Sequence, residues 1–386
     1  MRRIVHLIAE FSAHEAMGRT VVETASRVAG EHHLVTVRAH DGQAVFAGVH
    51  EMGGGIGTFP VRHTDEIATV LSRLRPNLVH LHAGALGPFQ AVLPVLRGVR
   101  KVLTMYAWPT LPGPRAWPRA RLAEMRASNV LQARVVATTV LPAALARATL
   151  RRAGIATVLT PDPRVVQRLA PGRDVDVIRL GCGAPTDARR ARFDADRPVI
   201  VFAGRAETVR GLDTLLAAFP SVRRRVPGAR LRLLLIPRPE LPAILAKAAA
   251  AGRDHAGAIE VVTEPVPDLL AELAEAQVGS WPFKFDYTTS PPAMAVAEAM
   301  SVGLPVVATD VACVRAVLDP GVNGLAVPPA HPPALADALV ELLSDESTWR
   351  RYADAGVRSV VERCGWDRVA ETTEGAYAAV LDRERA

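Results

Sequence analysis

Short apolar segments alternate with amphipathic helical segments along almost the whole chain of 386 residues. Each apolar segment has the length of a strand, and the segments between them have helical periodicity. This alternation is typical of a parallel β-sheet with helices on both faces, which defines an α/β fold class. In the N-terminal half it predicts helices at 15–29 and 65–74 and strands at 4–9, 34–38, 78–81, 99–105, 134–137, 157–160 and 175–180.

The segment 181–197 interrupts this pattern. It is rich in glycine, alanine, arginine and aspartate and has little periodicity, so we interpret it as a linker. Beyond it the alternation resumes, with strands at 199–203, 231–236, 259–262, 278–281, 305–309 and 323–327 and helices at 211–225, 241–251, 268–276, 332–343 and 347–361. We therefore expect two doubly wound domains, at 1–180 and from 198 onward, with a ligand in the cleft at the carboxyl ends of the strands.

One helix of the second half carries an unusual carboxylate. Ser290 can cap its N-terminus, and Pro291 suits its first turn, where the missing N–H would be unpaired anyway. Glu298 lies among alanine, valine and methionine, where a carboxylate is costly unless it meets hydrogen-bond donors. Because a helix N-terminus also binds anions, this helix suits a nucleotide sugar; a half-exposed glutamate that caps a neighbouring group is the alternative.

Two arginines follow the first strand of the second half. Arg205 leaves the predicted strand at its carboxyl end, and Arg210 lies five residues further on, before the next helix. Two guanidinium groups at this place can neutralise a diphosphate and the charge that builds up on it as a glycosidic bond breaks. The alternative is that both belong to a surface rich in arginine.

These motifs carry a resemblance to a known family, which is clearest over residues 198–379. The sequence reads VFAGR at 201–205, RGLDTLL at 210–216, AEAM at 297–300, GLPVVAT at 303–309 and GVNGLAV at 321–327. It resembles the retaining family 4 glycosyltransferases, which have the glycosyltransferase-B fold of two Rossmann-like domains. The resemblance implies a nucleotide-sugar domain at 198–365 and a helix at 366–386 that returns to the acceptor domain.

The resemblance also implies roles for single residues. Arg205 and Arg210 are expected to act on the diphosphate, and Glu298 is expected to bind the ribose. The family has a second glutamate where this chain has Ser290, so backbone N–H groups near Ala293 and Met294 are expected to take over part of the sugar contact. The donor site further includes Gly18, which resembles a family position before the first helix.

The acceptor side shows a second departure from the family. Tyr106 follows the strand at 99–105, where the family often has a histidine, and it is a catalytic candidate. His82 and Trp108 are expected to lie near the acceptor. The loop from Trp108 to Arg121, with Trp117 and several prolines and arginines, is interpreted as an acceptor lid or a membrane-touching patch, or else as a packed surface loop.

No metal site is expected. His80 and His82 alternate along a predicted strand, so we expect them to point to opposite faces and not to bind a metal together. Cys182, Cys313 and Cys364 are scattered and odd in number, which indicates a reducing cytoplasm rather than a metal cluster. The expected enzyme therefore uses no cofactor, only the nucleotide-diphosphate sugar as co-substrate.

Bulk composition leaves several partners open. The formal net charge is +7, which permits an anionic ligand or peripheral contact with an anionic membrane surface, but no motif supports nucleic acid. No apolar stretch is long enough for a membrane span, and the N-terminus does not read as a signal peptide. We therefore expect a cytoplasmic hexosyltransferase acting on a metabolite or glycoconjugate. The alternatives are a membrane-surface transferase with a lipid-linked acceptor and a non-catalytic nucleotide-sugar-binding protein.

Overall fold

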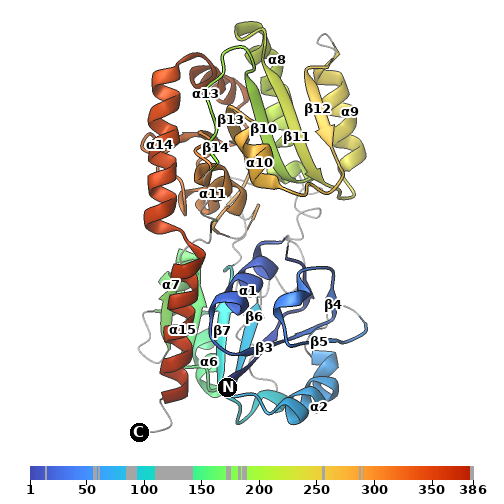
Figure 1. Ribbon diagram of the computed structural model, residues 1–386, viewed down its shortest axis with the longest axis vertical. Coiled ribbons are helices and arrows are strands. Elements are labelled where there is room, and N and C mark those ends of the chain that lie inside the picture. Colours follow the sequence, from blue (N-terminus) through green and yellow to red (C-terminus); the bar gives the residue numbers. More distant parts are fainter. Residues whose placement is uncertain are drawn as a thin grey trace. The chain divides into compact units, whose positions relative to one another are not determined.

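The chain forms two compact α/β units, each built on a parallel sheet (Figure 1). The first unit holds the N-terminal part of the chain together with the C-terminal helix, and the second holds the part from Ala184 to Gly365. The computed structural model describes residues 1–13, 15–54, 59, 61–83, 94–108, 142–170, 175–180, 184, 189–253, 257–286, 288–289 and 291–382.

The sheet of the first unit has seven parallel strands in the order β5-β3-β1-β6-β7-β8-β9. Its strands are β1 (Arg3–Leu7), β3 (Glu31–Thr36), β5 (Gly48–Glu51), β6 (Leu78–Ala83), β7 (Lys101–Met105), β8 (Thr157–Thr160) and β9 (Asp176–Arg179). The helices are α1 (Ala16–Arg27), α2 (Thr64–Leu74), α6 (Ala143–Arg152), α7 (Pro163–Leu169) and α15 (Trp366–Asp382). A small ladder joins β2 (Glu10–Phe11) to β4 (Arg38–Ala39) beside it.

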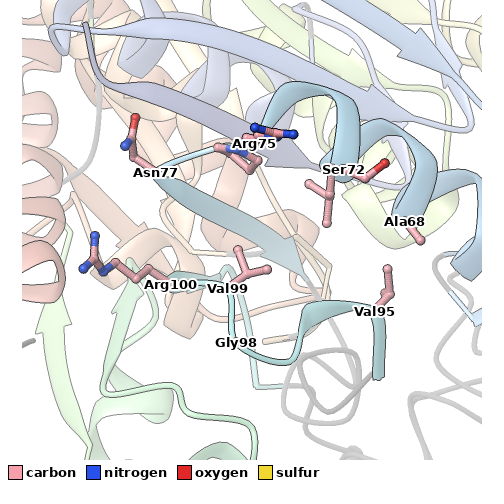
Figure 2. A pocket seen from close by; sticks show the side chains of 10 residues that line it. Ala68, Ser72, Arg75, Asn77, Val95, Gly98, Val99 and Arg100 are labelled. Carbon is pink, nitrogen blue, oxygen red and sulfur yellow. The ribbon is translucent and has the colours of Figure 1, made fainter.

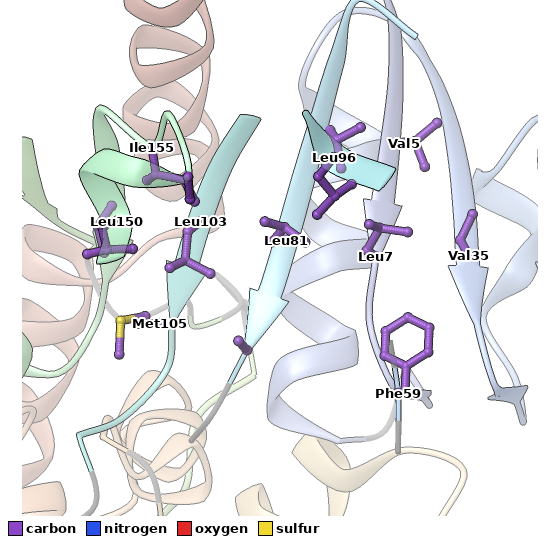
Figure 3. Close-up of a cluster of buried hydrophobic side chains, with 14 of the residues drawn as sticks. Val5, Leu7, Val35, Phe59, Leu81, Leu96, Leu103, Met105, Leu150 and Ile155 are labelled. Atoms are coloured by element: carbon purple, nitrogen blue, oxygen red, sulfur yellow. The ribbon is translucent and has the colours of Figure 1, made fainter. Parts of the chain in front are cut away.

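The two faces of this sheet differ in chemistry because side chains alternate along each strand. Val5, Leu7, Leu81, Leu103 and Met105 point to one face and form an apolar core with Leu150 and Ile155 (Figure 3). The residues between them point to the other face, where β1 and β6 place histidines, β7 places a threonine and Tyr106 follows β7. Helix α15 contacts α1, β7 and β8, as the resemblance implies for the C-terminal helix.

The sheet of the second unit has six parallel strands in the order β12-β11-β10-β13-β14-β15. These are β10 (Val199–Arg205), β11 (Arg230–Ile236), β12 (Ile259–Val262), β13 (Val278–Trp281), β14 (Val306–Thr309) and β15 (Leu325–Val327). Its helices are α8 (Leu212–Arg225), α9 (Leu241–Ala251), α10 (Leu269–Ala274), α11 (Met294–Ser301), α12 (Ala312–Arg315), α13 (Pro332–Ser344) and α14 (Glu346–Arg363).

The fold class predicted from the sequence is confirmed: two parallel, doubly wound sheets with a C-terminal helix on the first unit. Among the described residues, strands β2, β4 and β5 are additions that the alternation did not indicate. The strand predicted at 134–137 lies outside the described residues. No helix of the described part of the chain is long and apolar enough to cross a membrane.

Two expectations need correction. Helix α11 begins at Met294 with Ala293 as its N-cap residue, not at Ser290 and Pro291. The reason is that Pro292 disfavours helical backbone at the residue before it, so the helix begins only after both prolines. In addition, Cys364 is disulfide-bonded, although the scattered cysteines indicated a reducing environment.

Candidate functional site

The strongest candidate site lies at the carboxyl ends of β10 and β13 in the second unit. Strand β10 pairs with β11 on one side and with β13 on the other, so the strand order reverses between β10 and β13. Ligands bind outside the carboxyl ends of strands at such a switch point. The indole N–H of Trp281 donates to the carbonyl of Ala203 over 3.0 Å and ties the two strand ends together.

The loop after β10 is shaped by a glycine. Arg205 is the last residue of β10, and the short 3₁₀ turn Thr208–Arg210 leads to Gly211, which caps α8 with a φ of 79°. A Cβ atom at Gly211 would lie 1.7 Å from the carbonyl oxygen of Pro282. The loop can therefore pack against the segment after β13 only because residue 211 has no side chain.

Arg210 lies largely buried in this loop. Its guanidinium carbon is 5.5 Å from the centroid of the Phe283 ring, and its Nε lies 3.3 Å from Oε2 of Glu207. No described residue accepts a hydrogen bond from either terminal nitrogen of Arg210. Burial lowers the pKa of Arg210, and the nearby charge of Arg205 acts in the same direction. An arginine still stays charged under these conditions, so the two side chains form a cationic pair suited to a phosphate group.

Helix α11 starts close to this pair. The N–H of Ala293 donates to the carbonyl of Cys313 over 3.0 Å, and Cys313 is near enough to Arg210 to affect the pKa of the guanidinium. The N–H of Ala293 is thus already used and that of Val296 donates to the carbonyl of Ala293 over 3.0 Å, whereas a helix provides no backbone acceptor for the N–H groups of Met294 and Ala295. Glu298 lies further along α11 and is only 5% exposed. Ser290 lies outside the described residues.

Three residues at this site were missed from the sequence: Glu207, Phe283 and Lys284. Lys284 pairs with Asp213 in the first turn of α8 over 2.7 Å, and its backbone N–H donates to Val209 in the loop. A signal for two of them was present, because Phe283 and Lys284 come two and three residues after the end of β13, the neighbour of β10. Glu207 carries no such signal, since an acidic residue is not expected beside two phosphate-binding arginines.

In the first unit, position 18 requires a glycine because the neighbouring backbone leaves no room for a side chain. A Cβ atom at Gly18 would lie 2.1 Å from the carbonyl oxygen of Ser12. The turn before α1 is fixed by Asp41, which accepts a hydrogen bond of 2.9 Å from the Ser12 hydroxyl. The predicted donor-site glycine therefore holds the start of α1 tightly against this turn; its contact with a donor stays a prediction.

A buried chain of hydrogen bonds crosses the polar face of the first sheet. It runs from Tyr106 through His82, His6 and His32 to the carbonyl of Val28, which caps α1. The distances, in this order, are 3.0, 3.0, 2.9 and 2.8 Å. A fourth histidine, His80, lies beside the chain between the hydroxyls of Tyr377 on α15 and Thr104 on β7.

The carbonyl of Val28 at the end of this hydrogen-bond chain determines which group donates and which accepts in each of its bonds. It can only accept, so Nε2 of His32 carries a hydrogen and Nδ1 of His32 must accept from His6. Burial lowers the pKa of His6 and His32 and lowers that of His82 to about 3, so each ring is neutral with one N–H. Because Nε2 of His6 donates, Nδ1 of His6 must accept from Nε2 of His82. Nδ1 of His82 must then accept as well, so the hydroxyl of Tyr106 is the donor to it.

The expectation that His80 and His82 point to opposite faces is wrong. Residues two apart on a strand share a face, and the rings of His80 and His82 lie 3.9 Å apart between centroids. His6 is paired with His80 in register, so each of the three residues offers a ring nitrogen within 4.8 Å of the others, which is close enough to hold a metal ion. Their nitrogens nevertheless already take part in hydrogen bonds, and no carboxylate of the described residues contacts the three rings to offset a buried dication.

Tyr106 and Trp108 lie inside the first unit. The hydroxyl of Tyr106 belongs to the histidine chain, and burial raises the pKa of Tyr106. A catalytic role of Tyr106 stays a prediction. Trp108 is fully buried under the guanidinium of Arg168, and its backbone N–H donates to the carboxylate of Asp162 over 2.9 Å. Trp108 is therefore a core residue, not part of an exposed lid or membrane patch; the loop after it lies outside the described residues.

A separate cavity of about 580 Å³ lies between the end of α2 and the segment before β7 (Figure 2). Arg75, Asn77, Val99 and Arg100 lie along its wall. Asn77 and Arg100 directly precede β6 and β7, so the cavity is at the amino ends of the strands. It is thus at the opposite edge of the sheet from the strand ends at which α/β proteins bind their ligands.

Comparison with known proteins identifies a family for the second unit. The family model described as "Glycosyl transferases group 1" matches residues 197–345, which include Arg205, Arg210 and Glu298. A D-inositol 3-phosphate glycosyltransferase of Frankia alni is 30% identical over 227 residues, which are 57% of this chain and 54% of that protein. The chain thus spans about half the length of the first curated relatives it matches.

Solved structures share the fold over nearly the whole chain. A sucrose-phosphate synthase from Thermosynechococcus elongatus matches with a TM-score of 0.74 at 17% identity, covering 99% of this chain and 100% of that one. Anabaena HepE, in complex with UDP and glucose, matches with a TM-score of 0.73 at 11% identity, covering 98% and 100%.

A longer match comes from Mycobacterium tuberculosis. Its GDP-mannose-dependent alpha-(1-6)-phosphatidylinositol monomannoside mannosyltransferase is 30% identical over 276 residues, which are 66% of this chain and 70% of that protein. The resemblance carried by the arginine and Glu298 motifs is thereby confirmed, and the chain belongs to the group 1 glycosyltransferases, the retaining family 4 enzymes with the glycosyltransferase-B fold.

Proposed function

We propose that this chain transfers a sugar, with retention of configuration, from a nucleotide-diphosphate donor to a hydroxyl of an acceptor. One observation carries the proposal: Arg210 is largely buried at the carboxyl end of β10, beside Arg205, with no described acceptor for its two terminal nitrogens. A buried guanidinium in this state favours a bound oxyanion. A diphosphate supplies oxyanions of suitable size.

In this proposal each residue of the second unit has a defined role. Arg205 and Arg210 bind the diphosphate, Glu298 accepts hydrogen bonds from the ribose, and the first-turn N–H of Met294 faces the sugar phosphate. The bond from the anomeric carbon to the phosphate oxygen breaks with its electron pair going to that oxygen. The acceptor hydroxyl attacks from the same face, and its proton passes to the leaving phosphate, so no protein nucleophile is required. The arginines stabilise the charge of the leaving group.

The relatives narrow the choice of substrates. The Frankia alni protein is named for inositol phosphate and the Mycobacterium tuberculosis protein for GDP-mannose and a phosphatidylinositol mannoside. Anabaena HepE binds UDP and glucose. We infer a UDP- or GDP-hexose as donor and a phosphorylated polyol as acceptor. The longer match favours, as a second candidate, an acceptor that carries a lipid at a membrane surface.

The test is an assay of the purified chain with UDP-glucose, UDP-N-acetylglucosamine and GDP-mannose, each with and without inositol 3-phosphate and each in the presence and absence of EDTA. We expect slow hydrolysis of one donor, faster turnover with acceptor, and no loss in EDTA. Binding of UDP or GDP without any turnover would instead support a non-catalytic binding protein. Flotation with phosphatidylinositol vesicles distinguishes the lipid-linked candidate.

A further inference from the structure

Glu207 is an acidic residue inside the loop that carries Arg205 and Arg210. Its Oε2 lies 3.3 Å from Nε of Arg210, and its side chain is 17% exposed while that of Arg210 is 14% exposed. The backbone repeats this contact, because the N–H of Arg210 donates to the carbonyl of Glu207 over 3.0 Å. The turn Thr208–Arg210 thus fixes the backbone positions of both residues that make the contact.

The contact uses only one edge of the guanidinium. Nε is engaged by Glu207, and the ring of Phe283 lies against the group at 5.5 Å. The two terminal nitrogens keep their hydrogens for a ligand, and a planar guanidinium binds two phosphate oxygens best through such an edge. The orientation of this edge therefore depends on Glu207.

We propose that Glu207 is a positioning residue that holds Arg210 by its Nε and thereby presents the terminal nitrogens of Arg210 to the diphosphate of the donor. This inference rests on the proposed function. It has a second consequence, because the carboxylate also offsets one positive charge of the arginine pair. Glu207 then weakens binding of a diphosphate in the ground state while it improves the geometry that stabilises the leaving group.

The two effects have opposite signs in a Glu207→Gln variant. Loss of the negative charge raises the charge of the loop by one unit, so UDP and GDP should bind more tightly by up to about fivefold at low ionic strength. Loss of the ionic anchor frees Arg210, so the rate of donor hydrolysis should fall about tenfold or more. A residue needed only for folding would instead lower binding, rate and melting temperature together.

The chain offers a matched control on the same turn. Oε2 of Glu240 accepts a hydrogen bond of 3.0 Å from the backbone N–H of Thr208, and no ion pair between Glu240 and an arginine occurs among the described residues. Glu240→Gln should therefore leave both the Kd for UDP and GDP and the hydrolysis rate near wild type. A second control is Glu207→Gln in an Arg210→Lys background, where lysine has no Nε to hold, so the rate should change little further.

The experiment is calorimetry with UDP and GDP, together with hydrolysis of UDP-glucose and GDP-mannose, on these variants. Tighter binding with a lower rate in Glu207→Gln alone supports the assignment. Wild-type values in Glu207→Gln, parallel losses with a lower melting temperature, or the same shifts in Glu240→Gln would overturn it. Failure of the wild-type chain to bind either nucleotide is a different result, which overturns the proposed function itself.

Discussion

The phenol of Tyr106 donates a hydrogen bond of 3.0 Å to Nδ1 of His82. The direction of this bond is set by the carbonyl of Val28 at the other end of the histidine chain, across three imidazole rings. The chain begins after β7 and ends at the C-cap of α1, so it connects strands β1, β3, β6 and β7 with one helix. Tyr106 thus helps to hold the first unit together.

Replacing Tyr106 by phenylalanine should destabilise the protein. The change leaves Nδ1 of His82 buried without a donor, which typically costs about 1–3 kcal/mol of unfolding free energy. Urea denaturation measures this loss. Tyr352→Phe is the control, because the Tyr352 hydroxyl has no hydrogen-bond partner among the described residues, and it should change stability by less than ~0.5 kcal/mol. Equal losses of unfolding free energy in the two variants would contradict the stabilising role of the histidine hydrogen-bond chain.

The buried histidines should also make the protein sensitive to acid. Burial lowers the pKa of His6 and His80 well below 6.5 and that of His82 to about 3, while the unfolded chain keeps ordinary values. Below pH 6.5 the unfolded state binds protons that the folded state does not, so stability is fully present above this pH and is lost as the pH falls. Each group contributes up to about 1.4 kcal/mol per pH unit.

Unfolding free energies at pH 7.5 and 5.5 test this dependence. His82→Gln should be less stable than wild type at pH 7.5 but should lose less stability on acidification, because one titrating group is gone. An unchanged loss between the two pH values would show that His82 does not contribute in the way the structure implies.

Gly211→Ala should damage the second unit more than a comparable glycine substitution elsewhere. Gly211 and Gly321 both have left-handed backbone, with φ of 79° and 76°, but only Gly211 faces a backbone oxygen within 4 Å of the added Cβ. Alanine at either position should cost about 1–2 kcal/mol of unfolding free energy, because left-handed backbone is unfavourable for a residue with a Cβ atom. The clash with Pro282 should add at least about 2 kcal/mol for Gly211→Ala. Equal melting temperatures of the two variants would mean that the loop moves away without cost.

Glu298→Gln should weaken nucleotide binding with little loss of fold. A hydrogen bond from a ribose hydroxyl to a carboxylate is worth roughly 1.5–3 kcal/mol, so the Kd for UDP or GDP should rise about tenfold or more. Glu341→Gln on the exposed face of α13 is the control and should bind as wild type does. Calorimetry that finds the same Kd for both variants would remove Glu298 from the donor site.

The architecture could be predicted because it depends on local patterns. The apolar segments at 157–160, 259–262 and 278–281 and the helical segment at 241–251 coincide with β8, β12, β13 and α9. A strand buried on both faces is a continuous apolar run, which the sequence displays directly. The arginine loop was identified in the same way, because Arg205 ends such a run.

The histidine chain could not be predicted, because it depends on which strands are neighbours. His6, His32 and His82 come from three strands that the sheet order brings together, and the pairing of β1 with β6 sets His6 beside His80. Trp108 is a similar case, since an aromatic residue in a proline-rich segment gives no sign that Arg168 covers it. The cap of α11 was misplaced because the effect of Pro292 on Pro291 outweighed the capping preference of serine.

Steady-state kinetics of four arginine variants tests the central claim most directly. If Arg205 and Arg210 stabilise the leaving diphosphate, Arg205→Ala and Arg210→Ala should lower kcat by about 10²-fold or more and raise the donor KM by less. Arg210→Lys should recover much of the loss, because a point charge remains, and Arg205→Lys should recover less if Arg205 contacts two phosphate oxygens. Wild-type kcat in all four variants would show that the diphosphate is held elsewhere and that the second unit has been assigned the wrong site.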